Sequence, residues 1–292
     1  SRCFDDSPSQ RIGNSSVRIS NILGRTTCTT AEFLYADYNG DGQVTQREAI
    51  RFLFEQTDGD RWGSAYSNWE NVEMNECGLK GITCKHGQVS EIDLTFAPLC
   101  PPHKNGMPSV VCDGIPSEIG LLTNLEVLNL NRRDHLRGSI PTELGLLKRL
   151  RIVDLSRCSS LTGTIPSELG NLRNLVELNL SDCGLSGTIP SEIFELGNLE
   201  KLNLSLNNFE GSIPSNLGNL KSVKELSISR SYLNGKLPDS IGMMNALENL
   251  EIYGNLLTGT LPESIGKCGF LKRIDLFNNR LSGTIPASLS GL

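Results

Sequence analysis

The sequence predicts an α/β solenoid of about eight repeats, a right-handed superhelix with a parallel β-sheet on its concave side. Three observations carry this prediction. An Ile-Pro or Leu-Pro dipeptide returns every 24 or 25 residues, each repeat holds an L-x-L segment with the strand period of two, and a stretch S-x-x-(I/L)-G-x-L then fits a short helical or 3₁₀ return. Units this small cannot bury their own apolar edge, so neighbours must stack. The register is marked by Pro116, Pro141, Pro166, Pro190, Pro214, Pro238, Pro262 and Pro286.

The repeat itself reads L-x-x-L-x-L-x-x-N/C-x-L, which is the leucine-rich-repeat signature. Its leucines are expected to point into the solenoid, and the residues between them onto the concave face. The Asn or Cys is expected to turn inward and bond backbone groups that the end of the strand leaves unpaired. This position holds Cys158, Cys183, Asn207, Asn255 and Asn279, with Ser231 as a weaker substitute.

The following segment, L-x-G-x-I-P, resembles the plant-type leucine-rich repeat. That family includes the ectodomains of plant receptor kinases and the polygalacturonase-inhibiting proteins. The resemblance covers about residues 89–292, which we take as the solenoid domain. It implies the fold with high specificity, but it does not fix the function, because the same scaffold carries many partners.

Residues 1–48 form an N-terminal arm that ends in an EF-hand-like calcium loop. From Asp37 to Glu48 the chain reads D-Y-N-G-D-G-Q-V-T-Q-R-E, with oxygen-bearing groups at the ligand positions and Gly42 at the sharp turn. The predicted Ca²⁺ ligands are Asp37, Asn39, Asp41, Gln43 through its backbone carbonyl, Thr45 and Glu48. A polar loop that matches by chance is the alternative. Helices are expected over 30–36 and 46–56, and a single loop is expected to be a structural clamp rather than a sensor.

Residues 49–88 are expected to form a helical and disulfide-bonded cap on the first repeat. Apolar residues at helical spacing lead into Trp62 and Trp69, which we interpret as a lid over the solenoid rather than a binding patch. Cys77 and Cys84 stand just ahead of the first repeat, and their spacing resembles the disulfide of plant-type caps.

The remaining cysteines indicate the redox environment of the protein. Cys100 and Cys112 flank the one irregular insertion, and Cys3 and Cys28 remain to staple the arm, so most cysteines fall into local pairs and an oxidising, extracellular location is expected. Cys158 and Cys183 recur at one repeat position; a bridge between them is within reach, but two buried thiols are favoured because their Cβ vectors run parallel. Cys268 has no evident partner. Asn14, Asn179 and Asn203 begin glycosylation sequons.

Charge and motifs narrow the function. The chain has 292 residues, a net charge of −6 and a pI near 5.3, which argues against nucleic acid and anionic membranes as partners. The sequence contains no run of 18 consecutive apolar residues, which is about the length that a membrane-spanning helix needs. The three histidines are scattered and no catalytic motif is present, so the sequence makes no case for an enzyme.

A candidate contact surface lies in the last repeats. Tyr253 and Phe277 occupy one outward column in adjacent repeats, beside Glu251, Arg273 and Asp275, and could form a binding hot spot; ordinary surface variation is the alternative. The sequence thus predicts an extracellular module that binds a protein or glycan, with a structural calcium site. The alternative is a structural subunit of an extracellular or cell-wall assembly.

The C-terminal end carries a further expectation. The sequence stops at Leu292 inside a convex return, where core residues of the last repeat would meet water. We expect this end to be covered by another chain or by further sequence. The residues concerned are Leu271, Ile274, Leu276, Leu281, Ile285 and Leu289.

Overall fold

The computed structural model describes residues 45–56, 76–95, 114–134 and 136–291. Several predicted features lie outside these residues and stay predictions: the helix over 30–36, four of the calcium ligands, the two tryptophans, two cysteine pairs and one sequon. They are Asp37, Asn39, Asp41, Gln43, Trp62, Trp69, Cys3, Cys28, Cys100, Cys112 and Asn14.

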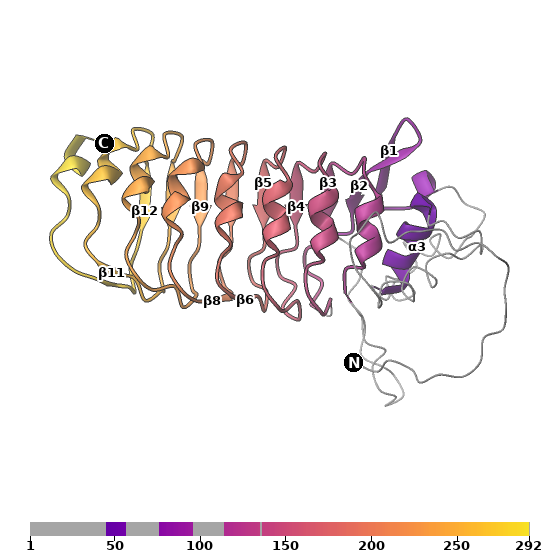
Figure 1. Cartoon of the computed structure of the whole chain (residues 1–292), viewed down its shortest axis with the longest axis horizontal. Helices are drawn as coiled ribbons and strands as arrows, with labels where there is room; N and C mark the ends of the chain where they lie inside the picture. Colours follow the sequence, from indigo (N-terminus) through magenta and orange to yellow (C-terminus); the bar gives the residue numbers. More distant parts are fainter. Residues whose placement is uncertain (1–44, 57–75, 96–113, 135, 292) are drawn as a thin grey trace, which may run out of the picture.

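The described residues build a nine-stranded sheet in the order β1-β2-β3-β4-β5-β7-β9-β10-β12. All strands after β1 run parallel and in the same register, so that Leu178 pairs with Leu202, and Leu226 with Leu250. Figure 1 shows the repeats following one another along the long axis of the molecule. The parallel strands are β2 (Gln88–Asp93), β3 (Val127–Asn129), β4 (Ile152–Asp154), β5 (Glu177–Asn179), β7 (Lys201–Asn203), β9 (Glu225–Ser227), β10 (Asn249–Glu251) and β12 (Arg273–Asp275).

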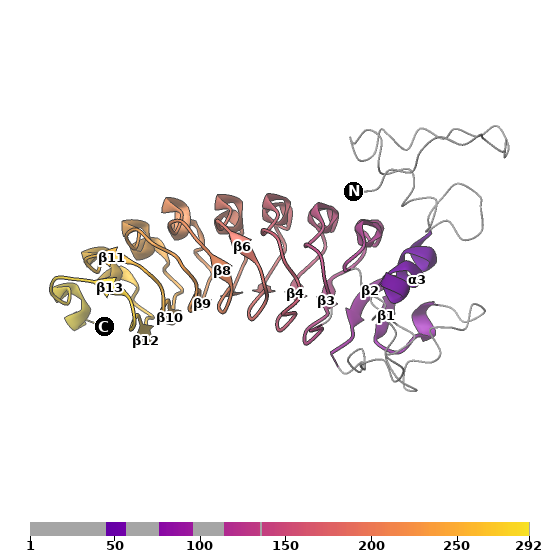
Figure 2. The ribbon, with the colours of Figure 1, turned by 90° about the horizontal axis from the view of Figure 1, so that it is seen from below.

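The predicted convex returns are 3₁₀ helices, each of which begins after the proline of a repeat. In a typical case Pro190 is extended, and the Ile193 amide donates to its carbonyl at 3.2 Å. Figure 2 shows these helices along the side opposite the strands. They are η4 (Ser117–Leu121), η5 (Thr142–Leu146), η6 (Ser167–Asn171), η7 (Ser191–Glu195), η8 (Ser215–Asn219), η9 (Asp239–Met243), η10 (Glu263–Lys267) and η11 (Ala287–Gly291).

Two small parallel pairs follow the sheet: β6 (Ser186–Gly187) with β8 (Asn208–Phe209), and β11 (Thr258–Gly259) with β13 (Arg280–Leu281). Between the strands and the returns runs one continuous core. The middle residue of each three-residue strand from β3 to β10 is fully buried, as at Leu178, and Phe194 and Phe209 are among the largest buried side chains. The leucine-rich-repeat solenoid predicted from the sequence is therefore confirmed.

The inward Asn and Cys positions bond the backbone as predicted. The Asn207 amide donates to the carbonyl of Leu180 at 2.8 Å and accepts from the Leu185 amide at 3.1 Å. At the same position, the thiol of Cys158 donates to the Leu130 carbonyl at 3.3 Å. The Ser231 hydroxyl makes one bond, to the Asn207 carbonyl at 3.2 Å, in keeping with its weaker role.

Cys158, Cys183 and Cys268 are buried free thiols, so the favoured interpretation of the first two is confirmed. Burial raises the pKa of Cys158 to about 12 and that of Cys183 to about 11, and it also raises the pKa of Cys268. The Cys268 thiol donates to the carbonyl of Ile241 at 3.2 Å. All three thiols are thus neutral packing groups.

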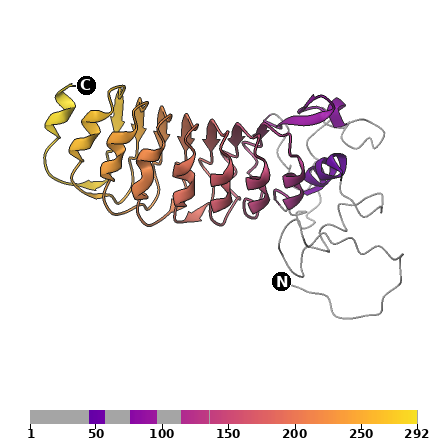
Figure 3. The ribbon, with the colours of Figure 1, turned by 45° about the horizontal axis from the view of Figure 1, so that its top comes forward.

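The N-terminal end of the solenoid is covered by helix α3 (Gln46–Gln56), which has the predicted bounds. Thr45 and Glu48 cap it reciprocally: the Thr45 amide donates to Glu48 Oε2 at 2.7 Å, and the Glu48 amide to Thr45 Oγ1 at 3.2 Å. The apolar face, including Leu53, is buried, and Gln46 Oε1 accepts from the Val89 amide of β2 at 2.8 Å. Figure 3 shows the helix against the first repeat.

Beside α3, the expected disulfide joins Cys77 of η3 (Glu76–Gly78) to Cys84 of β1 (Ile82–Lys85), with their Cα atoms 5.5 Å apart. β1 was not predicted. It pairs antiparallel with β2 through a two-residue turn at His86 and Gly87, both at positive φ. None of the described helices is long and apolar enough to cross a membrane.

At the other end, the core residues of the last repeat are only half-buried, and Ile285 and Phe270 are 83% and 66% exposed. The expectation that this end is covered stays a prediction.

Candidate functional site: the concave face

The concave face is an array of rows, because each strand exposes its first and third residues and buries the second. The last three residues of β2 align with the three-residue strands that follow, and the first residues of these aligned segments form row 1: Glu91, Val127, Ile152, Glu177, Lys201, Glu225, Asn249 and Arg273. The third residues form row 2: Asp93, Asn129, Asp154, Asn179, Asn203, Ser227, Glu251 and Asp275. The outward direction predicted for these positions is confirmed.

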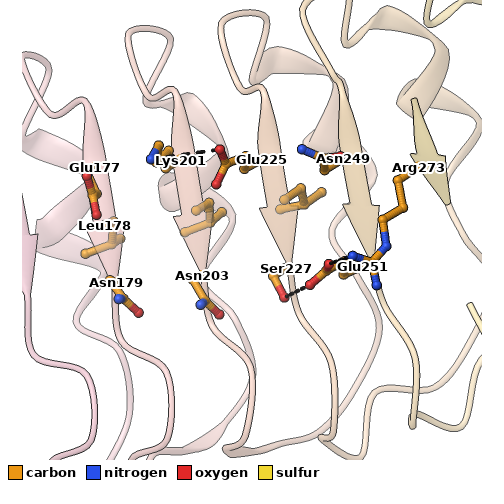
Figure 4. Close-up of a pocket in the computed structure, with 12 residues that line it drawn as sticks. Glu177, Leu178, Asn179, Lys201, Asn203, Glu225, Ser227, Asn249, Glu251 and Arg273 are labelled. Carbon is orange, nitrogen blue, oxygen red and sulfur yellow. Dashed lines mark hydrogen bonds and ion pairs between the residues drawn. The ribbon is translucent and has the colours of Figure 1, made fainter. Parts of the chain in front are cut away.

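A groove of about 390 Å³ lies on this face between β5 and β12. The row 1 and row 2 residues of β5 to β10 line it together with Arg273 of β12, and strand leucines, of which Figure 4 labels Leu178, are also among the lining residues. Glu177 stands at one end and Arg273 at the other. Both sequon asparagines of the described residues, Asn179 and Asn203, line the groove, so a glycan on either would obstruct it; whether they carry glycans stays a prediction.

Ion pairs concentrate at the Arg273 end. Its guanidinium contacts Glu251 Oε1 at 3.4 Å and Asp275 Oδ2 at 3.2 Å, and the Ser227 hydroxyl donates to Glu251 Oε2 at 3.3 Å. Lys201 and Glu225 are 3.8 Å apart (Figure 4). Exposed pairs of this kind contribute at most about 1 kcal/mol each, so they orient side chains more than they stabilise the fold.

Glu177 differs from the other acids of the groove. Its carboxylate makes no hydrogen bond or ion pair with any described residue, and its side chain is partly exposed. The neighbouring asparagine instead serves the strand end, since Asn179 Oδ1 accepts from the amide and hydroxyl of Ser181 at 3.2 and 2.7 Å. Glu177 is thus a charge directed at solvent within the groove.

Row 3 follows row 2 two residues later and is uncharged wherever described. From the first strand to the last, it consists of Thr95, Asn131, Ser156, Ser181, Ser205, Ser229, Tyr253 and Phe277. Tyr253 and Phe277, which we call the aromatic corner, stack with ring centroids 4.6 Å apart and an angle of 7° between the planes. Phe277 is 54% exposed. The predicted corner is therefore brought together, with Arg273 holding the two predicted carboxylates beside it.

Arg230 completes the corner and was not assigned to it from the sequence. Its guanidinium carbon lies 5.8 Å from the centroid of the Tyr253 ring, within the range of a cation–π contact. Its amide donates to the Tyr253 carbonyl at 2.8 Å. Arg230 and Tyr253 are 23 positions apart and therefore occupy different positions of their repeats. The sequence can indicate this contact only when the register of neighbouring strands is known.

Arg230 belongs to an edge row in which the chain takes positive φ as it leaves each strand. The row comprises Arg132, Arg157, Asp182, Leu206, Arg230, Gly254 and Asn278, with φ between 54° and 68°. The amides continue the parallel ladder, as where the Arg157 amide donates to the Ser181 carbonyl at 2.8 Å. This turn is what directs the next residue, the Asn or Cys, into the core.

Of the predicted calcium ligands, the structure describes Thr45 and Glu48. Glu48 is 7% exposed and holds the helix cap described above. Within the described ranges, no three His, Cys, Asp or Glu side chains come close enough to hold a metal ion. The calcium loop stays a prediction, because most of it lies outside those ranges.

The comparisons with known proteins agree with this architecture. Residues 138–257 match a family model described as a leucine-rich repeat region, and residues 270–292 match a leucine-rich repeat model. A search of curated proteins finds no significant match.

Among solved structures, the plant peptide hormone receptor RGFR1 in complex with RGF2 is 37% identical over 61% of this chain and 28% of the receptor chain, with a TM-score of 0.58. The complex of PEPR1 with AtPEP1 is 29% identical over 82% of this chain and 32% of that one, with a TM-score of 0.72. A third structure is the ectodomain of the plant membrane receptor kinase GASSHO1/SCHENGEN3 from Arabidopsis thaliana in complex with CASPARIAN STRIP INTEGRITY FACTOR 2. It is 29% identical over 85% of this chain and 31% of the ectodomain chain, with a TM-score of 0.66.

This chain spans about a third of the length of those receptor chains. The repeats, the parallel sheet and these similarities lead to one conclusion: the protein has the leucine-rich-repeat solenoid fold, and the solved structures it resembles include ectodomains of plant receptors.

Proposed function

We propose that this protein is an extracellular binding module that recognises a protein partner on the C-terminal half of its concave face. The aromatic corner carries the proposal. Exposed aromatic side chains with an adjacent Arg are the residue types that dominate binding energy at protein interfaces. Here they stand beside a polar groove on a sheet face that no described residue covers. The role assigned to this face is binding, not catalysis.

The similar structures support this class of partner. RGFR1 and PEPR1 are seen in complex with RGF2 and AtPEP1, and the former is a peptide hormone receptor. An extracellular location is supported by the Cys77–Cys84 disulfide, because such bonds persist in oxidising compartments.

The stacking geometry favours a protein over a glycan. Sugar rings bind aromatic side chains through an open ring face. One face of Tyr253 lies against Phe277, and Arg230 is placed over the ring as well. The corner therefore offers mainly ring edges and one outer face, which suit the side chains of a peptide.

The proposal is tested with peptides selected on the protein from a random displayed library. Replacing Tyr253 and Phe277 together by Ala is expected to weaken a selected peptide by about 30-fold, which corresponds to about 2 kcal/mol. The matched control is Tyr232→Ala, because Tyr232 is an equally open aromatic, 58% exposed, outside rows 1 to 3 and the edge row. Equal affinities of the double variant and the wild type in a fluorescence titration would remove the corner from the binding surface.

We also propose a structural Ca²⁺ site in the N-terminal arm. The fit of residues 37–48 to the calcium loop supports it, and so does the position of Glu48, which the helix cap holds at the start of α3.

A further inference from the structure

The charge of the concave face is unevenly distributed between its rows. Rows 1 and 2 hold seven carboxylates and two cations, a balance of −5 in a chain whose net charge is −6. Row 3 is uncharged, and the described edge row carries three Arg against one Asp. The solenoid thus presents an acidic strip along its strands, bounded on one side by neutral and then basic residues.

The strip is only partly neutralised from within. Arg273 serves two carboxylates at once, those of Glu251 and Asp275, and Lys201 lies at the distance limit of an ion pair with Glu225. Glu177, at the far end of the groove, has no cationic partner among the described residues. A ligand cation placed there would gain a charge-assisted hydrogen bond without breaking an existing one.

The groove also sets the length of its occupant. From β5, which carries Glu177, to β12, next to Phe277, there are four strand spacings, or about 19 Å at about 4.8 Å each. An extended peptide advances about 3.3 Å per residue, so roughly six or seven residues cover this span. One end of such a peptide meets a free carboxylate, and the other meets the aromatic corner.

We infer that the partner segment bound on this face is a short extended basic peptide, with Lys or Arg at Glu177 and an apolar residue at the aromatic corner. This inference rests on the proposed function and names the chemistry of the partner. Acidic peptides are disfavoured by the same charges, since approach to the strip adds like-charge repulsion without relief.

The test begins with a random octapeptide library displayed on phage and selected on the whole protein at 150 mM salt, where non-specific attraction is screened over about 8 Å. We expect the selection to enrich peptides that carry Lys or Arg near one end and an apolar residue about six positions from that basic residue. Enrichment of acidic or neutral peptides whose binding still depends on Tyr253 and Phe277 would overturn the charge inference and leave the proposed function intact. Failure to enrich any peptide, or binding that ignores the corner, would count against both.

The second step is a matched pair of charge variants against one selected basic peptide. Glu177→Gln is expected to weaken its affinity three- to tenfold, because the ligand cation loses its carboxylate. Glu210→Gln removes the same charge from an exposed position outside rows 1 to 3 and should leave affinity unchanged. Equal losses in both variants would show that only net charge matters, and the assignment of Glu177 would fall. Neither carboxylate makes a hydrogen bond or ion pair with another described residue, so both variants should fold normally.

Discussion

Leu206 occupies a backbone conformation that suits it poorly. Its φ is +60°, in the left-handed region, where a side chain of this kind costs about 1–2 kcal/mol. The equivalent positions of other repeats hold Gly254 and Asn278, residues that adopt this conformation more readily. Burial of the Leu206 side chain compensates little for this backbone strain, because Leu206 is 42% exposed.

Leu206→Asn is therefore expected to raise the free energy of unfolding by about 0.5–1 kcal/mol, measured by urea denaturation. Leu146→Asn is the control. Leu146 is exposed to a similar degree, 45%, but it lies in η5 at ordinary φ, so the same substitution should bring no gain. A loss of stability in Leu206→Asn would mean that the apolar contacts of Leu206 outweigh its backbone strain.

Among single residues, those that repeat in register were predictable from the sequence. Tyr253 and Phe277 share a column 24 residues apart, so their stacking follows once the strands align. Arg230 was not predictable as their partner, because its contact with Tyr253 runs between different rows. Arg133 was also missed: it is a buried cation at the position where other repeats place Asn or Cys.

Among the elements, the strands and returns followed from the period, and α3 followed from apolar residues at helical spacing after the calcium-loop motif. β1 did not, because a strand of four residues with one Gly-containing turn carries too little pattern to distinguish it from a loop. The small pairs β6–β8 and β11–β13 were missed for a related reason: two residues cannot display a period.

Helix α3 joins the calcium prediction to the solenoid. Glu48 is at once the proposed bidentate ligand and the N3 residue of the capping box that begins at Thr45. Glu48→Gln separates these roles, because Gln still accepts the Thr45 amide bond but lacks the charged bidentate carboxylate. With millimolar calcium, the wild type should unfold at a higher temperature than with chelator, whereas Glu48→Gln should show no such difference.

Calorimetry of calcium binding provides the second measurement for this site. Heat of binding is expected for the wild type and should be absent for Glu48→Gln. In chelator, the two proteins should have similar thermal stability, since the helix cap is retained. A wild type that neither binds calcium nor responds to chelator would rule out the proposed clamp.

At the scale of the whole molecule, stability depends on how closely successive returns approach. Gly218 of η8 packs so tightly on the next repeat that an added Cβ would overlap the carbonyl of Ser240 and come within 2.9 Å of Met243 Cβ. Neither group is free to move, because the Ser240 backbone is part of η9 and Met243 follows in the same helix. A single methyl group at this point must therefore push two repeats apart.

Because each repeat contacts only its neighbours, a displaced interface in the middle of the array should weaken the coupling between its two halves. Gly218→Ala is expected to lower the free energy of unfolding by about 2–3 kcal/mol, in the range of overpacked sites, and to broaden or split the urea transition. Gly197→Ala is the matched control: its Cβ would meet nothing within 4 Å, and its φ is not in the left-handed region. It should unfold in the same transition as the wild type. If Gly218→Ala also unfolds in one unshifted transition, the returns tolerate separation, and the strands with their inward Asn and Cys bonds suffice to couple the repeats.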